Sequence, residues 1–258
     1  MEVHVANVAQ IPRQKVKSDV KDAERLLRLW RNGDLPESYL PEDELQRLRD
    51  LGRHRVMLAE ESRRFKSKIK HDLYKHGHFV KENPLNNEKG RAWLRTLDFP
   101  EIRSALRIWE NLQVEIDEFQ RLIEKETTDH PVAKRLMTVP GIGAYTALVI
   151  LAEVADFKRF PDGDHLASYA GLTPSLHQSG DHARTGDITK MGNPTLRFFL
   201  VEAAHNHVRS CPDSRLSMSH FRIEEKRGKG KAIVATARQL CRALWTMMDR
   251  EEDFKVNP

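Results

Sequence analysis

Cysteine, aromatic residues and long hydrophobic runs are all scarce in this sequence. The 258 residues include two cysteines, Cys211 and Cys241, and aromatic residues make up 7 %. Both cysteines lie in helix-like segments, so we expect free thiols in a reducing compartment and no disulfide framework. The most apolar run, residues 144–155, is too short to span a bilayer, and no signal peptide is visible at the N-terminus. We therefore expect a cytoplasmic protein without membrane contact.

Charged residues, by contrast, are plentiful. They make up 31 % of the chain against 39 % hydrophobic residues, so we expect a modest core and a large polar surface, which suits elongated helices. Lysine and arginine total 43 and aspartate and glutamate 38, which gives a formal net charge of +5. This excess favours a polyanionic partner without demanding one.

The first residues are predicted to form a strand, a helix and a linker. Residues 2–8 alternate apolar and polar side chains, as a short strand does. Residues 19–31 follow a good N-cap, Ser18, and stop at an Asn-Gly pair, which predicts a helix. Residues 35–41 contain two prolines and are typical of a linker.

Two long helices are predicted next. Residues 43–76 and 101–125 each carry an apolar stripe, and the polar residues 81–89 separate them. An ordinary pair of core helices in a bundle would show similar stripes. Because few apolar residues lie off the stripes, we favour an antiparallel coiled-coil hairpin.

From residue 131 onward the pattern indicates a compact helical domain with few strands. It continues through a glycine-rich loop, a helix over residues 194–208, a Cys-Pro break and a last helix over residues 231–249. The chain as a whole is thus predicted to be mainly α.

A helix-hairpin-helix turn opens this domain at residues 139–143, Val-Pro-Gly-Ile-Gly. Gly141 and Gly143 let the backbone turn sharply and leave free N–H groups at the start of a helix over residues 144–153. Those groups and the positive end of the helix dipole favour an anion. We expect this turn to hold a nucleic-acid phosphate.

Asp19 and Asp22 are candidates for a metal site. They are three residues apart, so they share a face of the predicted helix. Two neighbouring carboxylates suit a hard cation such as Mg²⁺, and two such ions can clamp the attacking and leaving oxygens of a phosphodiester. Aspartate is also common at helix N-termini because it complements the dipole, so both interpretations stay open.

Ser179 is a candidate nucleophile. It lies beside Gly180 in a glycine-flanked loop, with His177, His182 and Arg184 nearby. A serine hydroxyl needs a base, a lowered pKa or a metal to attack phosphorus, and we expect the histidines to contact phosphate or solvent and not to act as bases. A loop serine that caps a turn is the alternative.

Basic residues gather in several places. A single basic run is usually a solvated face, but several runs together with the hairpin turn favour nucleic acid, with salt-sensitive affinity. We expect contacts to DNA from Gly141, Gly143, Arg184, Lys190 and Arg197, and further neutralisation from residues 226–231 and the cluster at residues 63–70.

Together these segments resemble the transposases of the IS110 insertion-sequence family, which are related to Piv-type DNA invertases. The resemblance covers nearly the whole chain. It rests on the Lys-Ser-Asp-Val-Lys-Asp-Ala motif at residues 17–23, the basic helical hairpin, the turn at 140–143, Gly-Leu-Thr-Pro at 171–174, Ser179-Gly180, the run at 188–197, and Gly230-Lys231 leading into Ala235 and Ala237.

The resemblance implies a RuvC-like, RNase H-type domain with an Asp-Glu-Asp-Asp metal site, a coiled coil, and a C-terminal domain with an essential serine. Asp19 and Asp22 match the last two acidic residues, and Ser179 matches the nucleophile. The family recombines DNA as a multimer, and some members use a guide RNA encoded by the element. The implied cofactor is Mg²⁺, and the implied partners are DNA, further copies of the chain and such an RNA.

The resemblance also implies an N-terminal truncation. The first aspartate and the glutamate of the pattern belong to strands that would precede residue 1, and residues 2–8 match the last strand. We therefore expect a remnant of the RuvC-like α/β domain at residues 1–36, the coiled-coil hairpin at 37–128 and the helix-hairpin-helix transposase domain at 129–258. By itself, the chain is expected to bind Mg²⁺ weakly or not at all.

The leading interpretation is a transposase or recombinase that cleaves and rejoins DNA through a serine and is incomplete as this chain. One alternative is a non-catalytic helix-hairpin-helix DNA-binding protein, such as a decayed transposase acting as a regulator. Another is a coiled-coil interaction protein with incidental basic charge. Strand cleavage with Mg²⁺ separates the first from the second, and salt-dependent DNA binding separates the second from the third.

Overall fold

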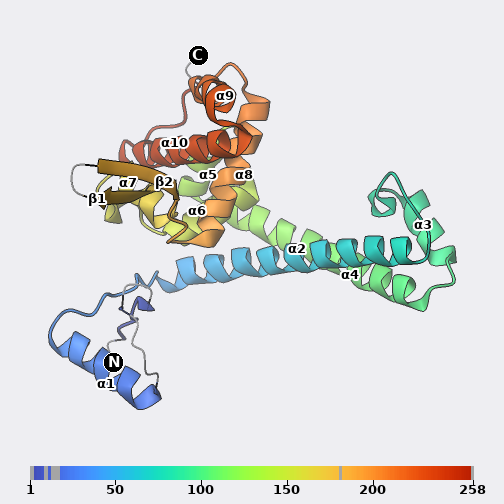
Figure 1. Cartoon of the computed structure of the whole chain (residues 1–258), viewed down its shortest axis with the longest axis horizontal. Helices are drawn as coiled ribbons and strands as arrows, with labels where there is room; N and C mark the ends of the chain where they lie inside the picture. Colours follow the sequence, from blue (N-terminus) through green and yellow to red (C-terminus); the bar gives the residue numbers. More distant parts are fainter. Residues whose placement is uncertain (1–2, 9–10, 13–17, 180–181, 257–258) are drawn as a thin grey trace. The chain divides into compact units, whose positions relative to one another are not determined.

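The chain is mainly helical, as predicted (Figure 1). The computed structural model describes residues 3–8, 11–12, 18–179 and 182–256, with the backbone alone of residues 176–179 and 182–185. Its backbone contacts form two units, Met1–Glu44 and Leu45–Pro258, and each is described by itself. Within the described residues, every helix is too short or too polar to cross a membrane.

The first unit contains the α-helix α1 (Asp19–Arg31), at the predicted bounds. The Ser18 hydroxyl caps its start by accepting a hydrogen bond from the Lys21 amide at 3.4 Å. Its C-cap, Asn32, is followed by Gly33, whose φ of +72° is a conformation that glycine adopts without strain. None of the residues of α1 is buried.

The strand predicted at residues 2–8 is wrong for the part that the structure describes. Among residues 3–8, one isolated antiparallel bridge joins Ala6 to Glu37. The partner segment contains Pro36, which has no N–H to donate, so a ladder cannot continue along it. Residue 2 lies outside the described residues.

Two long helices dominate the next part of the chain. They are α2 (Asp43–Lys75) and α4 (Pro100–Thr128), and they lie side by side (Figure 1). The Trp109 indole N–H of α4 donates to the Ser62 hydroxyl of α2 at 3.0 Å. The polar residues 81–89 were predicted only to separate the two helices. In the structure, the connection contains a 3₁₀ turn, η2 (Pro84–Asn86), and a helix, α3 (Glu88–Thr96).

The rest of the chain forms a compact helical domain around α6 (Ala144–Val154). Eight of the eleven residues of α6 are buried, because neighbouring helices cover it on several sides, as its continuous apolar run requires. The surrounding elements are α5 (Pro131–Met137), η3 (Phe157–Arg159), α7 (Gly163–Tyr169), α8 (Pro194–Ser210), α9 (Arg215–Arg227) and α10 (Lys229–Asp249).

The predicted glycine-rich loop is instead a β-hairpin in the structure. Strand β1 (Pro174–Ser179) pairs antiparallel with β2 (His182–Ile188), with a register irregularity between Pro174 and Leu176. These strands carry polar residues at most positions. They therefore lack the alternation of apolar and polar side chains from which a strand is predicted. Helix α9 was also missed, since its apolar residues, Leu216, Met218, Phe221 and Ile223, are scattered among polar ones.

Candidate functional site

Ser179, the predicted nucleophile, is the last residue of β1 and not part of a loop. It lies opposite His182 in the ladder, and His177 lies opposite Arg184. Directly opposite positions share a face of an antiparallel pair, and so do positions two apart on one strand. The four positions therefore belong to one face at the end of the hairpin. Gly180 lies outside the described residues.

The base of this hairpin is closed by hydrogen bonds between its two strands and adjoins the core. The Ser175 hydroxyl donates to the Asp187 carbonyl at 2.9 Å, and the Thr189 amide donates to the Thr173 carbonyl at 2.9 Å. Leu172, just before the hairpin, is 1 % exposed and belongs to the core. The hairpin therefore extends from a rigid base.

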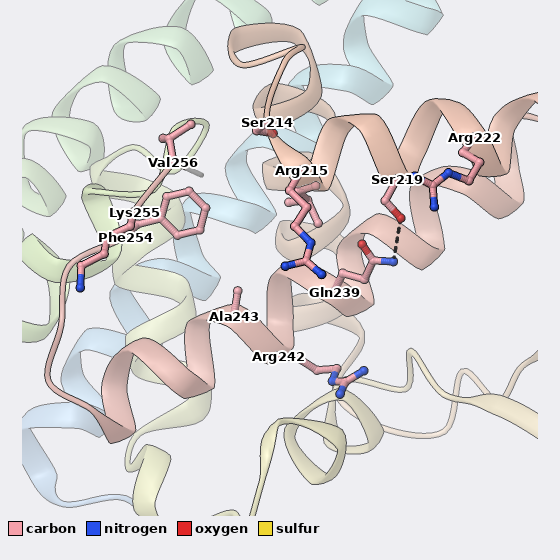
Figure 2. Close-up of a pocket in the computed structure, with 11 residues that line it drawn as sticks. Ser214, Arg215, Ser219, Arg222, Gln239, Arg242, Ala243, Phe254, Lys255 and Val256 are labelled. Carbon is pink, nitrogen blue, oxygen red and sulfur yellow. Dashed lines mark hydrogen bonds between the residues drawn. The ribbon is translucent and has the colours of Figure 1, made fainter. Parts of the chain in front are cut away.

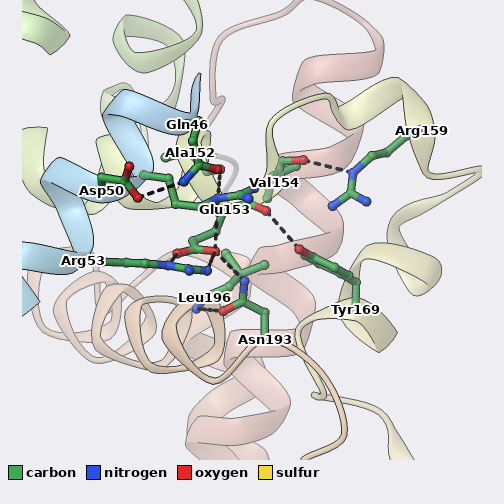
Figure 3. A network of polar contacts seen from close by, with 11 residues as sticks. Gln46, Asp50, Arg53, Ala152, Glu153, Val154, Arg159, Tyr169, Asn193 and Leu196 are labelled. Atoms are coloured by element: carbon green, nitrogen blue, oxygen red, sulfur yellow. Dashed lines mark hydrogen bonds and ion pairs between the residues drawn. The ribbon is translucent and has the colours of Figure 1, made fainter. Parts of the chain in front are cut away.

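A buried ion pair holds the segment that follows the hairpin (Figure 3). Glu153 of α6 is 1 % exposed and accepts two hydrogen bonds from Arg53 of α2, at 2.7 and 2.9 Å. Its Oε2 also accepts from the Asn193 side-chain amide at 2.7 Å. The hydrogen bond to Glu153 is the main reason why the pKa of Arg53 is raised. The carboxylate is thus satisfied on three sides, as a buried charge must be.

Asn193 joins this network to the start of α8. Its side-chain oxygen accepts from the Leu196 amide at 3.0 Å and caps the helix. Its backbone amide donates to the Tyr169 carbonyl at 2.8 Å, and the Tyr169 hydroxyl donates to the Glu153 carbonyl at 3.2 Å (Figure 3). The conformation of the run at residues 188–197 is therefore set by α6 and α7.

Sequence reasoning missed this network. Neither Glu153 nor Arg53 was assigned a role, and Asn193 entered only as part of the run at residues 188–197. The signal in the sequence was a single carboxylate inside an otherwise apolar helix. A carboxylate that is buried with such a helix needs a partner, so this pattern predicts a buried polar contact.

Arg197 has a structural position. It is half-buried, and its Nη1 donates to the Ala170 carbonyl at 3.0 Å and to the Lys190 carbonyl at 3.3 Å. A side chain at Gly171 would collide with this guanidinium. Lys190 itself is exposed, with a positive φ of +52°. Arg197 therefore braces the loop that presents Lys190.

A basic groove lies at the base of the hairpin, and we call it the hairpin groove. Its volume is about 740 Å³. Hairpin residues form one wall, and the end of α9 and the start of α10 form the other. Asp187 is its acidic lining residue, whereas four lining residues are basic: Lys190, Arg227, Lys231 and Arg238.

Most of this positive charge is available to a ligand. Arg238 pairs with Asp164 of α7 at 2.8 Å. Among the residues that the structure describes, the side chains of Lys190, Arg227 and Lys231 form no hydrogen bond or ion pair. The groove therefore offers three free cations beside the hairpin, which suits a phosphate-rich ligand.

The two glycines of the predicted helix-hairpin-helix turn lie in different surroundings. Gly141 has a φ of +98°, and an added Cβ would stand 2.6 Å from the His207 amide nitrogen of α8. Gly143 is the exposed N-cap of α6, and nothing lies within 4 Å of the corresponding point. Gly141 thus packs against α8, and the open amides at this helix start begin at Gly143.

Asp19 and Asp22 are both exposed in the first turn of α1. Their oxygens are the donor type that Mg²⁺ prefers, and one or two carboxylates with waters and phosphate oxygens make up many Mg²⁺ sites. No group of three or more histidine, cysteine, aspartate or glutamate side chains able to hold a metal occurs within the described residues. The pair fits part of a Mg²⁺ site.

Comparisons with known proteins identify relatives for both ends of the chain. Residues 133–218 match the model of the transposase family IS116/IS110/IS902, and residues 1–76 match a DEDD-type transposase model of the IS110 group. The second match extends into α2, beyond the remnant of the N-terminal domain that was predicted at residues 1–36. The N-terminal domain is therefore not truncated in the way that was predicted.

Individual relatives agree with these matches. A putative transposase of Sinorhizobium fredii is 26 % identical over 92 % of this chain and 66 % of its own length. A probable family 20 transposase of Pseudomonas aeruginosa is 29 % identical over 57 % of this chain and 44 % of its own length. The pilin gene-inverting protein of Moraxella bovis is 38 % identical over 29 % of this chain and 24 % of its own. The chain covers less than two thirds of each of these three relatives. Its two matched segments are transposase domains of the IS116/IS110/IS902 type.

Proposed function

We propose that this chain is a DNA transposase that cleaves and rejoins strands through Ser179. The observation that carries the proposal is the pair of transposase matches, at residues 1–76 and 133–218, whose second member includes the whole hairpin. The geometry is compatible with it, because the end of a hairpin with a rigid base can reach a bound strand.

The proposed chemistry is a transesterification at phosphorus. The Ser179 oxygen forms an ester bond to the scissile phosphate while the bond to one DNA oxygen breaks, so the bond energy is kept for rejoining. Arg184 shares its hairpin face and is proposed to stabilise the charge that develops on the phosphate oxygens.

DNA is proposed to lie along the hairpin groove. Lys190, which is exposed, would contact a phosphate directly, and Arg197 would act by holding the Lys190 loop. The amides that begin at Gly143 would contact a second phosphate at the start of α6, while Gly141 shapes the turn. These contacts reach the backbone and not the bases, so they predict affinity that depends on salt more than on sequence.

Asp19 and Asp22 would hold Mg²⁺ as two of four acidic ligands. When bound, such an ion supplies positive charge at the reacting phosphate. The other two ligands are proposed to come from a longer form of the protein or from a partner chain, consistent with action as a homo-oligomer on cytoplasmic DNA. A guide RNA encoded by the element is a further partner to be tested.

A non-catalytic DNA-binding role is the second candidate. It is favoured by one observation, that Asp19 and Asp22 have no third acidic, histidine or cysteine neighbour to complete a metal site among the described residues. A regulator would need the groove and the helix-hairpin-helix turn but not Ser179.

The test is a covalent adduct between this chain and DNA. A full-length homologue whose own matching serine is replaced by alanine supplies the missing carboxylates, together with Mg²⁺ and nicked target DNA. We expect an adduct with the wild-type chain, none with Ser179→Ala, and an undiminished adduct with Ser210→Ala, which removes an exposed hydroxyl at the end of α8. DNA binding should be nearly equal in all three proteins. No adduct with the wild-type chain, at normal DNA affinity, would favour the regulator.

A further inference from the structure

A second basic hollow lies between α9, α10 and the C-terminal residues 254–256 (Figure 2). We call it the α9–α10 hollow, and its volume is about 480 Å³. Its lining residues include four cations and no carboxylate: Arg215 and Arg222 from α9, Arg242 from α10, and Lys255 from the C-terminal segment.

Two of these cations have no partner among the residues that the structure describes. Arg242 lies 3.7 Å from the Asp164 carboxylate, and Lys255 pairs with Glu252 at 2.8 Å. Arg215 and Arg222 are exposed, and among the residues that the structure describes neither guanidinium forms a hydrogen bond or an ion pair. Two free guanidinium groups in one hollow raise its potential for an anion.

The distance between the two arginines suits a ligand that carries several anionic groups along its length. They are seven residues apart on α9, which is two turns and about 10 Å along the helix axis. Ser219 lies between them on the same side, and its hydroxyl accepts a hydrogen bond from the Gln239 amide of α10 at 3.2 Å (Figure 2). Successive phosphates of one DNA strand rise by about 3.4 Å along the duplex axis and lie further apart than that in space, so a separation of about 10 Å is on the order of one to two nucleotide steps.

We propose that the α9–α10 hollow is a second DNA-backbone site, in which Arg215 and Arg222 each bind a phosphate of one strand. A single small anion would leave one of the two arginines without a partner, whereas a strand presents phosphates at both. Arg222 and Arg215 act as phosphate ligands, and Gln239 positions Ser219 between them. The inference rests on the proposed function only in taking DNA as the ligand, and it does not involve Ser179.

The two basic sites are connected through α10. Arg238 lines the hairpin groove and Arg242 lines the α9–α10 hollow, one turn further along the helix. Asp164 of α7 contacts both arginines. DNA that leaves the hairpin groove thus meets a second set of cations on the neighbouring helix surface.

The experiment measures the salt dependence of binding to a short random-sequence DNA duplex. Removing one phosphate-binding cation should lower the slope of log affinity against log salt by about 1. We expect Arg215→Gln with Arg222→Gln to lower the slope by about 2 relative to the wild-type chain. The control, Arg107→Gln with Arg121→Gln, removes the same charge from two exposed residues of α4 and should leave the slope unchanged.

Several outcomes would overturn the proposal. An unchanged slope in the Arg215 and Arg222 double variant, with the Ser179 adduct still formed, contradicts this inference and leaves the proposed function intact. An equal fall in the control variant means that net charge alone matters. If inorganic phosphate raises the thermal midpoint of the wild-type chain but not of the double variant, and the DNA slope is the same in both, the hollow binds a free anion. A lowered slope without any Ser179 adduct supports the hollow and contradicts the proposed function.

Discussion

Helices α1 and α6 are of similar length but lie in opposite environments. α1 has thirteen residues and none is buried, and its apolar Leu27 and Trp30 are 47 % and 49 % exposed. α6 has eleven residues, of which eight are buried. The first helix is stabilised mainly by local terms, such as its Ser18 cap, whereas the second is stabilised by the core that surrounds it.

The acidic residues of these helices differ in the same way. Glu153 of α6 is buried and bound to Arg53 and Asn193, so its charge stabilises the fold. Asp19 and Asp22 of α1 are exposed and have no such partners among the described residues, so their oxygens remain accessible to an ion. The comparison shows that the Glu153 carboxylate is structural, whereas the oxygens of Asp19 and Asp22 are accessible, as their proposed metal-binding role requires.

The largest expected effect is at the turn that leads into α6. Gly141→Ala should destabilise the protein by about 4 kcal/mol, because alanine is strained at a φ of +98° and its Cβ would press on the backbone of α8. Gly143→Ala, at an open position with an ordinary φ of −92°, should change the free energy of unfolding little. Urea unfolding of both variants measures the difference, and equal losses would contradict the packing described for Gly141.

The next largest effect concerns the buried ion pair. Glu153→Gln should destabilise by about 2 kcal/mol, because it removes the charged acceptor of the hydrogen bonds from Arg53 and Asn193. The loss stays below that for a fully buried pair, since the Arg53 side chain is 52 % exposed. Glu126→Gln removes an exposed partner of Arg47 and should cost less than about 1 kcal/mol. Similar losses in the two variants would remove the contrast between a structural and a surface carboxylate.

A smaller effect is expected from pH. His207 of α8 is buried, and its Nδ1 lies 2.9 Å from the Pro140 carbonyl of the turn before α6. Burial lowers the pKa of His207 from its ordinary 6.5. The unfolded chain therefore binds more protons below pH 6.5, and the free energy of unfolding should fall as the pH drops through this range. Unfolding titrations should show a shallower fall in His207→Gln, and identical pH profiles would contradict this.

The smallest effect on stability is expected in α1. Asp19→Asn with Asp22→Asn should change the free energy of unfolding by less than about 1 kcal/mol, since the pair contributes only through the helix dipole. The chain alone should bind Mg²⁺ weakly, and the double variant more weakly still, whereas Glu24→Gln on the same helix should match the wild type. Tight stoichiometric Mg²⁺ binding in a calorimetric titration would contradict an incomplete site.

Helices α1, α2 and α4 were predictable because their signals are local, whereas α3 and α9 were missed. Ser18 and the Asn-Gly pair bounded α1, and the apolar stripes located α2 and α4. The β-hairpin was not predictable, because its polar strands show no alternation and its base is closed by a hydrogen bond from Thr189 to Thr173 that forms only in the fold.

The candidate site was predictable in part. Motif order located Ser179, Asp19 and Asp22, whose roles remain predictions. The bracing role of Arg197 and the partners of Glu153 depend on residues far away in the sequence, and no spacing rule reveals them.

The most direct test of the account identifies the residue that carries DNA. The wild-type chain, labelled with heavy nitrogen, is mixed with the serine-deficient full-length homologue, Mg²⁺ and nicked DNA, and the trapped adduct is digested and mapped by mass spectrometry. The account predicts a nucleotide linked through a phosphodiester to the labelled peptide that contains Ser179. A nucleotide on any other residue of the labelled chain would contradict the assignment of Ser179 as the nucleophile.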